Sequence, residues 1–270
     1  MEYLEPIQLV LYSTLFSICI LFILLLYQGK LDLIKRVAKS DLKKYAFLGF
    51  LNPCLYYIIL FKAYDALPAQ EAMVINFSWP VMLVILSIPI LKQSIDFKSF
   101  LSIIVCYLGV VVIATNGDLF SMKFVNPFGV LLMLTSTVIW SLFWLFNTKN
   151  SNDSVVSLFL IFLFSFPFIL GFVVLTNSFI IPSLEGLIGS IYIGFFEMGV
   201  SLVLWQSALK ISTTVSRVAS LVFITPFLSL IILYLVLGEK ILISTITGII
   251  LICTGLLLQK YFTNKATQNS

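Results

Sequence analysis

Apolar residues in this chain are gathered into nine long runs that are separated by short polar joints. Each run is about 20 residues long, which suits a helix that crosses the hydrocarbon core of a membrane. The runs cover residues 6–27, 45–63, 69–91, 98–115, 127–147, 155–176, 186–207, 214–237 and 240–261. The pattern predicts an all-α polytopic membrane protein with nine transmembrane helices.

Two stretches repeat one pattern at a constant offset of 146 residues. The first begins at Phe77 and the second at Phe223, and each has an apolar run opened by proline, a polar joint, and a second apolar run with a late glycine. The matched positions are Phe77/Phe223, Pro80/Pro226, Ile85/Ile231, Leu91/Leu237, Ile95/Ile241, Ile104/Ile250 and Gly109/Gly255, with Gln93 on Glu239. Because this spacing has no gap, we infer one helical hairpin used twice.

The match extends upstream of the hairpin at an offset of 145, through Gly49/Gly194 and Ala63/Ala208. Run 45–63 therefore pairs with run 186–207, and by position run 6–27 pairs with run 155–176. The chain divides into a first repeat of four helices, residues 1–118, and a second of five, residues 127–262, followed by a polar cytoplasmic tail, residues 263–270. Helix 127–147 has no counterpart.

Basic residues fall mostly in alternate joints. If segment 28–44 faces the cytoplasm, 13 of the 16 lysines and arginines lie inside, and only Lys62, Lys123 and Lys240 lie outside. By the positive-inside rule, this asymmetry predicts an external N-terminus and a cytoplasmic C-terminus. Helix 69–91 and its counterpart 214–237 then cross in opposite directions, so the two repeats are inverted.

Composition supports a membrane protein and excludes several other classes. With 60% hydrophobic and 10% charged residues, the chain lacks the polar surface of a soluble domain. The net charge of +4 comes from residues scattered among joints, so no nucleic-acid partner is expected. There is no histidine, and the four cysteines lie inside apolar runs without a CxxC pair. We expect no metal site and no cofactor.

The repeated pattern resembles the drug/metabolite transporter superfamily, and in particular its EamA-type members. The resemblance rests on the segments AYDALPAQEA and SALKISTTVSRVAS, each followed by the proline, the Gln or Glu, and the glycine of the repeat. The segment QEAMVINFSWP is similar to the branch of aromatic amino-acid exporters. The family implies ten helices in two inverted five-helix repeats, so this chain resembles a 4+5 form of a 5+5 plan. A misplaced start, a truncated gene and a working nine-helix form are the open interpretations.

Glu197 is the first candidate site residue. It lies near the middle of run 186–207, where a carboxylate costs about 2.5–3.5 kcal/mol and should face protein or water. It could titrate with protons or bind a substrate ammonium group, or it could be a protonated packing residue. Its repeat counterpart is Asn52, and Pro53, the residue after Asn52, is expected to disturb the helix. We expect symmetry to bring Asn52 and Glu197 toward one central site.

Asn76, Trp79 and Pro80 share one face of their helix by helical spacing. Pro80 leaves the Asn76 carbonyl without its helical donor, and the group could wall a cavity or only shape the bundle. Pro226 is the matching kink of the second repeat. Two further candidates for substrate binding are Trp140, the deeper tryptophan of run 127–147, and Tyr56. Tyr56 and Tyr57 both lie inside a span, and one of them is expected to face protein, because a phenol in lipid lacks a partner.

These features favour a secondary carrier that exports small organic metabolites such as amino acids by alternating access. The expected partners are a small-molecule substrate and the lipid bilayer, and the expected location is a bacterial cytoplasmic membrane. No Walker motif is present. An inactive, truncated or regulatory bundle is the alternative. A membrane enzyme is disfavoured because histidine, paired carboxylates and a nucleophile–base motif are lacking. Monomer and homodimer stay open.

Overall fold

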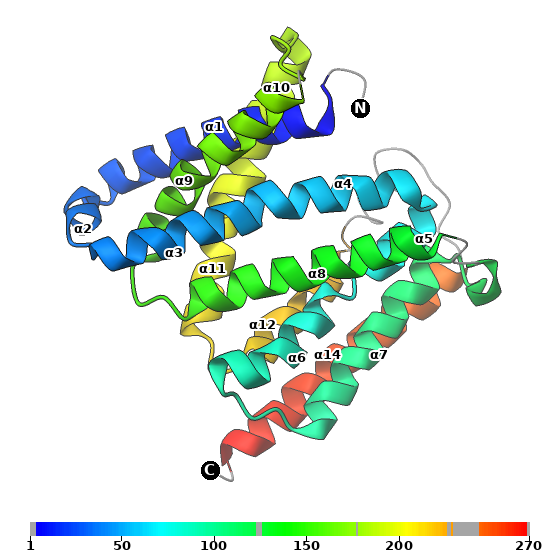
Figure 1. The fold of residues 1–270 in the computed structure, drawn as a ribbon. Coiled ribbons are helices and arrows are strands. Elements are labelled where there is room, and N and C mark those ends of the chain that lie inside the picture. The colour runs from blue at the N-terminus through cyan, green and yellow to red at the C-terminus, as the bar shows by residue number, and fades with distance from the viewer. Residues whose placement is uncertain (1–3, 123–125, 177, 226–227, 229–242, 269–270) are drawn as a thin grey trace. The chain divides into compact units, whose positions relative to one another are not determined.

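The computed structural model describes residues 4–122, 126–176, 178–225, 228 and 243–268 (Figure 1). Within these ranges the chain is all-helical and contains no β-strand. The helices form two compact units. Unit 1 comprises residues 1–61 and 146–211, and unit 2 comprises residues 62–145 and 212–270.

The principal helices follow the apolar runs closely. Their bounds are α1 Pro6–Tyr27, α2 Leu31–Lys35, α3 Lys39–Gly49, η1 Phe50–Leu55, α4 Tyr56–Ala66, α5 Ala69–Asn76, α6 Trp79–Leu91, α7 Phe97–Ala114, α8 Pro127–Thr148, α9 Ser154–Leu175, α10 Leu184–Tyr192, η3 Ile193–Ser201, α11 Leu202–Ile211, α12 Val215–Leu221 and α14 Ile243–Gln268. The segment η3 is π-helical, whereas η1 contains a break in the helix at Asn52. Short 3-10 turns cover Leu119–Ser121 and Val222–Ile224.

Eight described helical segments are long and apolar enough to cross a membrane. The protein is therefore an integral, multi-pass membrane protein. The remaining predicted span, 214–237, is described only in part: Val215–Ile224 is an apolar helix, and Pro226 lies outside the described residues.

Several helices extend beyond the apolar runs. The predicted span 45–63 is longer in the structure, because helix begins at Lys39 and continues through η1 and α4 to Ala66. Polar residues of the first turn can stay helical outside the hydrocarbon core, where Asp41 and Lys44 form an i,i+3 ion pair at 3.2 Å. Helix α9 begins where the side chain of Asp153 caps the first backbone N–H groups. The apolar run in the sequence therefore marks the part of a helix that lies in the membrane, and the helix itself can be longer.

In unit 1, α1 and α9 pack side by side in opposite directions. The rings of Phe22 and Phe159 lie 6.0 Å apart, and Val10 shares a buried cluster with Val173 near the other ends of the two helices. Residue numbers increase along α1 as they decrease along the neighbouring α9, so the two helices are antiparallel. These are the two helices that the sequence pairs by position in the two repeats.

Two glycines let neighbouring helices approach backbone to backbone in unit 1. A Cβ at Gly49 would lie 2.5 Å from the carbonyl O of Ile161 in α9, and one at Gly194 would lie 2.6 Å from the carbonyl O of Ser13 in α1. The arrangement is reciprocal, because Gly49 of the first repeat contacts a helix of the second, and its counterpart contacts a helix of the first. Small residues at such crossings permit close helix packing in membranes.

Glycines also permit a close approach of two helices in unit 2, between α7 and α14, which lie side by side (Figure 1). A Cβ at Gly109 would lie 2.6 Å from the carbonyl O of Gly248, and one at Gly255 would lie 2.7 Å from the carbonyl O of Ser102. The offset of 146 relates both the two glycines and their two partners. The pairing also runs in opposite directions, since the later residue of α7 meets the earlier residue of α14.

The membrane-spanning helices are interrupted where the sequence places proline kinks. Asn52, the residue before Pro53, has non-helical angles (φ −145°, ψ 125°) inside η1. Helix α5 ends at Asn76 and α6 begins at Trp79, with Pro80 in its first turn. Proline lacks the N–H that would continue the helical bonding, which explains both positions.

Candidate functional site

A pocket of about 160 Å³ in unit 1 contains the carboxyl group that the sequence singles out. Glu197 lies midway along the helical span Leu184–Ile211, in the π-helical segment η3. The pocket is lined by Leu9, Val10, Ser13, Tyr57, Phe61, Ile193, Glu197 and Met198. Glu197 itself is exposed, so the pocket is open on its side. The carboxylate therefore faces a small site whose walls are mainly apolar.

Packing against α1 holds η3 in place around Glu197. The hydroxyl of Ser17 donates a hydrogen bond of 3.0 Å to the carbonyl O of Met198, the residue after Glu197. Gly194 and Gly199 bring the same segment close to α1, at Ser13 and Ile20 respectively. A π-helical turn is wider than an α-helical one and frequently occurs at functional sites. The backbone on both sides of Glu197 is thus fixed by α1.

The aromatic wall of the pocket comes from α4. Tyr57 and Phe61 are half-buried, and their rings lie 5.6 Å apart. The predicted site residue Tyr56 is instead buried, with its ring 5.0 Å from the ring of Tyr57 in an edge-on arrangement. Successive residues of a helix point about 100° apart, which is why only one of the two tyrosines lines this pocket.

Asn52 lies midway along its own span, Lys39–Ala66, as Glu197 does in the counterpart span. It is 1% exposed, and its Oδ1 atom has no hydrogen-bond partner among the described residues. The described lining of the Glu197 pocket does not include Asn52. The structure therefore gives the two residues matching positions along their spans, Asn52 at a break in η1 and Glu197 in the π-helical segment η3, without placing both in one pocket.

The predicted site residues Asn76, Trp79 and Trp140 lie in unit 2, where the two tryptophans contact each other. The rings of Trp79 and Trp140 are 6.2 Å apart and nearly perpendicular, and Ser141 donates a hydrogen bond of 3.2 Å to the carbonyl O of Trp79. Asn76 donates a hydrogen bond of 3.1 Å to the hydroxyl of Tyr64. Trp79, at the start of α6, therefore packs against α8. The sequence did not predict this contact between the two helices.

Of the eight residues that line the pocket, the sequence singled out Glu197 as a site residue. Ser13 and Phe61 were not predicted, and Tyr57 was considered only as the alternative to Tyr56. Ser13 is buried, and its hydroxyl has no hydrogen-bond partner among the described residues. A usable signal was the pair Ser13 and Ser17, spaced one helical turn apart in an otherwise apolar run. Leaving a buried polar atom unpaired costs about 1–3 kcal/mol, so this hydroxyl is available to a ligand or a water molecule.

A second group of polar residues gathers at one end of unit 1. Lys30 forms an ion pair of 2.7 Å with Asp153, and Lys210 donates a hydrogen bond to the carbonyl O of Asn152. Asn152 and Asn150 donate hydrogen bonds of 2.8 and 2.9 Å to the hydroxyl of Tyr45. Joints that are distant in sequence therefore meet at the same end of the unit. No group of acidic, histidine or cysteine residues suited to a metal ion occurs within the described part of the chain.

Comparison with known proteins gives one consistent result. The profile of the EamA-like transporter family matches residues 1–115 and 127–259. An "Uncharacterized transporter" of Clostridium kluyveri is 27% identical, covering 97% of this chain and 85% of the relative. An "Uncharacterized transporter" of Archaeoglobus fulgidus is 28% identical, covering 82% and 79% respectively. The "Uncharacterized transporter YvbV" of Bacillus subtilis is also 28% identical, covering 83% and 74%.

Solved structures share this fold, and one of them, titled "Crystal structure of protein", is an example. It matches with a TM-score of 0.80, covering 97% of this chain and 89% of its own, at 16% sequence identity. At that identity the likeness concerns the fold alone.

Proposed function

We propose, because this chain belongs to the EamA-like transporter family, that it is a secondary carrier for a small organic solute with a cationic amine, such as an amino acid. The observation that carries the proposal is Glu197, a carboxyl group midway along a membrane span that faces a mainly apolar pocket. A carboxylate at this depth requires neutralisation by a proton or a cation. A substrate ammonium group and a coupling proton are the two species that could supply it.

The side chains around Glu197 suit such a substrate. Ser13 offers an unpaired hydroxyl, and the rings of Tyr57 and Phe61 offer apolar and cation–π contact. The volume of about 160 Å³ restricts the site to a small molecule. Asn52 is a second polar group at the same depth of the matching span, and its free oxygen is an acceptor for the substrate in another state of the transport cycle.

The carrier works by alternating access of two inverted repeats. Two observations support this arrangement. The helices that correspond between the repeats, α1 with α9 and α7 with α14, run in opposite directions. In addition, the glycine contacts are reciprocal at the offset of the sequence repeat. An inverted repeat supplies two equivalent arrangements, one open to each side of the membrane. The similarity of QEAMVINFSWP to aromatic amino-acid exporters suggests export.

Counterflow into proteoliposomes tests the carrier directly. Vesicles loaded with one solute of a panel of amino acids, sugars and nucleosides are mixed with trace labelled solute of the same kind. We expect saturable exchange for a solute that carries an amine. Exchange with no member of the panel would instead favour the inactive bundle, and conversion of a solute into a new product would favour an enzyme.

The role of Glu197 is tested with Glu197→Gln, which keeps the shape of the side chain and removes its charge. We expect the exchange rate to fall on the order of 100-fold or to lose its dependence on pH. Glu185→Gln is the matched control, because Glu185 is exposed in the first turn of α10 and does not line the pocket. Unchanged exchange with an unchanged pH profile in the Glu197 variant would refute the proposed site.

A further inference from the structure

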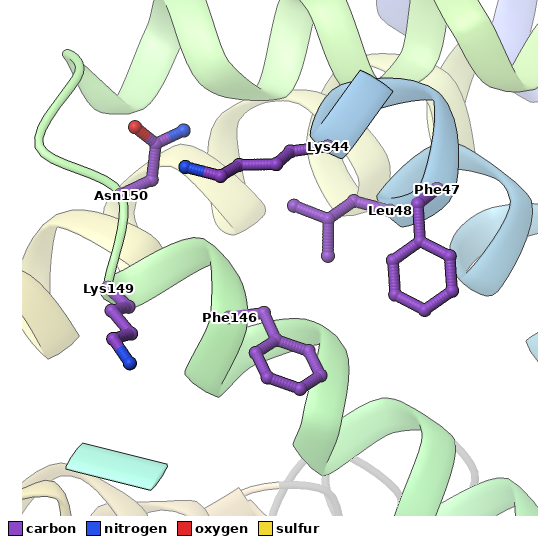
Figure 2. A pocket seen from close by; sticks show the side chains of 6 residues that line it. All are labelled: Lys44, Phe47, Leu48, Phe146, Lys149 and Asn150. Carbon is purple, nitrogen blue, oxygen red and sulfur yellow. The ribbon is translucent and has the colours of Figure 1, made fainter. Parts of the chain in front are cut away.

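A second pocket of unit 1, of about 460 Å³, combines basic and apolar side chains. It lies between the second half of α3 and the end of α8, and it is lined by Lys44, Phe47, Leu48, Phe146, Lys149 and Asn150 (Figure 2). Figure 2 shows the side chain of Lys44 extending toward Asn150, whereas the rings of Phe47 and Phe146 lie on the other side of the pocket. The lining is therefore divided into a polar side and an apolar side.

The division coincides with the ends of two membrane spans. Lys44 directly precedes the apolar run of its span, and Lys149 directly follows the last residue of α8. Phe47 is 54% exposed and Phe146 is 40% exposed, at positions where a membrane protein faces acyl chains. A ligand of this pocket would need a charged part level with the lysines and an apolar part that reaches into the bilayer.

The charges of the pocket favour an anion. Lys44 is held only by the exposed ion pair with Asp41 on its own helix, and such pairs contribute little. Among the described residues, no acidic side chain forms an ion pair with Lys149. Lys30 and Lys210, also at this end of unit 1, are instead engaged by Asp153 and Asn152. Lys44 and Lys149 are thus the basic side chains that line the pocket and can contact an anion bound in it.

We infer that this pocket binds the head group of one anionic phospholipid of the cytoplasmic leaflet. The phosphate contacts the ammonium groups of Lys44 and Lys149. One acyl chain lies along Phe47, Leu48 and Phe146. The distribution of basic residues predicts that this end of the unit faces the cytoplasm, where anionic lipids are concentrated. Basic pockets between membrane helices on that side bind anionic head groups.

Lipid retention by the full chain tests this site without any transport assay. The protein is reconstituted in phosphatidylcholine vesicles with and without phosphatidylglycerol, extracted in mild detergent and examined by native mass spectrometry. We expect one phosphatidylglycerol to be retained in preference to phosphatidylcholine. The double variant Lys44→Gln/Lys149→Gln should lower that preference on the order of tenfold.

The matched control is Lys39→Gln/Lys43→Gln, which removes two charges from exposed positions of α3 outside the pocket. We expect this control to retain phosphatidylglycerol as the wild type does. Asp41→Asn should act in the opposite direction and raise retention, because it releases Lys44. Equal loss in both double variants would show a diffuse surface charge and overturn the site. Displacement of the lipid by inorganic phosphate or glycerol phosphate at comparable concentration would overturn the lipid assignment in favour of a soluble anion.

Discussion

Asp153 joins two segments of unit 1 that are far apart in the sequence. Its carboxylate accepts a hydrogen bond from Lys30 at 2.7 Å and caps α9 by accepting from the backbone N–H groups of Val155 at 2.9 Å and Val156 at 3.4 Å. Partial burial raises the pKa of Asp153, but the hydrogen bonds from Lys30 and the Val155 amide and the positive charge of Lys30 outweigh it. The pKa of this carboxyl therefore lies below its ordinary value.

Two substitutions of Asp153 distinguish the contribution of its helix cap to stability from the contribution of its charge. Asp153→Ala should lower the free energy of unfolding by about 1–2 kcal/mol, since α9 loses its cap and Lys30 its partner. Asp153→Asn keeps an oxygen that can cap the helix, so it should lose less. Equilibrium unfolding in mixed micelles measures both values. Equal losses in the two variants would show that the charge, and not the cap, stabilises this junction.

The lowered pKa of Asp153 also predicts a dependence on pH. Because the pKa is lower in the folded chain than in the unfolded chain, where it is about 3.9, the stabilisation is complete above the unfolded value. It is lost as the pH falls through the folded value. Unfolding measured from neutral pH down to about pH 3 should show the wild type losing stability on acidification, with a smaller loss in Asp153→Asn. Parallel curves for the two proteins would contradict this assignment.

At the scale of elements, helix pairs in both units are set by glycines that meet backbone atoms. Those atoms cannot rotate away, unlike the end of a flexible side chain. Gly49 meets the backbone of α9, and Gly109 meets the backbone of α14. Two other glycines of the membrane spans, Gly171 and Gly189, have open space, with no atom within 4 Å of the position that a Cβ would take. The chain therefore contains both packed and unpacked glycines in similar helices.

Alanine substitution should act in opposite directions at these two kinds of position. Gly49→Ala and Gly109→Ala should each lower the free energy of unfolding by about 1–3 kcal/mol, because the helices must move apart. Gly171→Ala and Gly189→Ala should leave it unchanged or raise it by up to about 1 kcal/mol, because alanine favours helix. Unfolding of the four variants under one set of conditions decides the point. A loss at the open positions as large as at the packed ones would refute the packing argument.

For the whole molecule, the orientation in the membrane is the property with the widest consequences. The basic residues predict that the joint around Lys35 is cytoplasmic and that the joint around Phe120 is external. Both positions are exposed, and Phe120 is 95% exposed, so a cysteine at either would be open to a reagent in solution. The lipid site and the direction of transport both depend on this orientation.

Labelling of single cysteines tests the orientation in intact cells. Lys35→Cys and Phe120→Cys are made separately after the natural cysteines Cys19, Cys54, Cys106 and Cys253 have been replaced. A membrane-impermeant maleimide added outside should modify the Phe120 variant at once and the Lys35 variant only after permeabilisation. The reverse pattern would place the basic joints outside and remove the argument for a cytoplasmic-leaflet lipid.

The compact units of the whole molecule differ from the repeats of the sequence. Each unit takes helices from both repeats, as with α1 and α9 in unit 1 and α7 and α14 in unit 2. Corresponding helices pair with each other, so an inverted repeat need not form two separate sequential domains. This explains why glycines at equivalent positions face the opposite repeat.

The order of amino acids was enough to predict the membrane class, the length and order of most spans, the repeated glycine and proline positions, and the position of Glu197 midway along its span. These properties depend on local hydrophobicity and on spacing along one helix, which the chain records directly. The sequence did not indicate which of Tyr56 and Tyr57 lines the pocket, because both lie in one apolar run.

Packing between helices selects which side chains share a pocket, and the sequence did not predict it. Ser13, Tyr57 and Glu197 come from three spans of unit 1 that lie far apart in the sequence. The π-helical segment at Glu197 and the contact between Trp79 and Trp140 also depend on neighbouring helices. In a membrane, every helix is apolar, so hydrophobicity cannot select its neighbours, and close packing at small residues decides them instead.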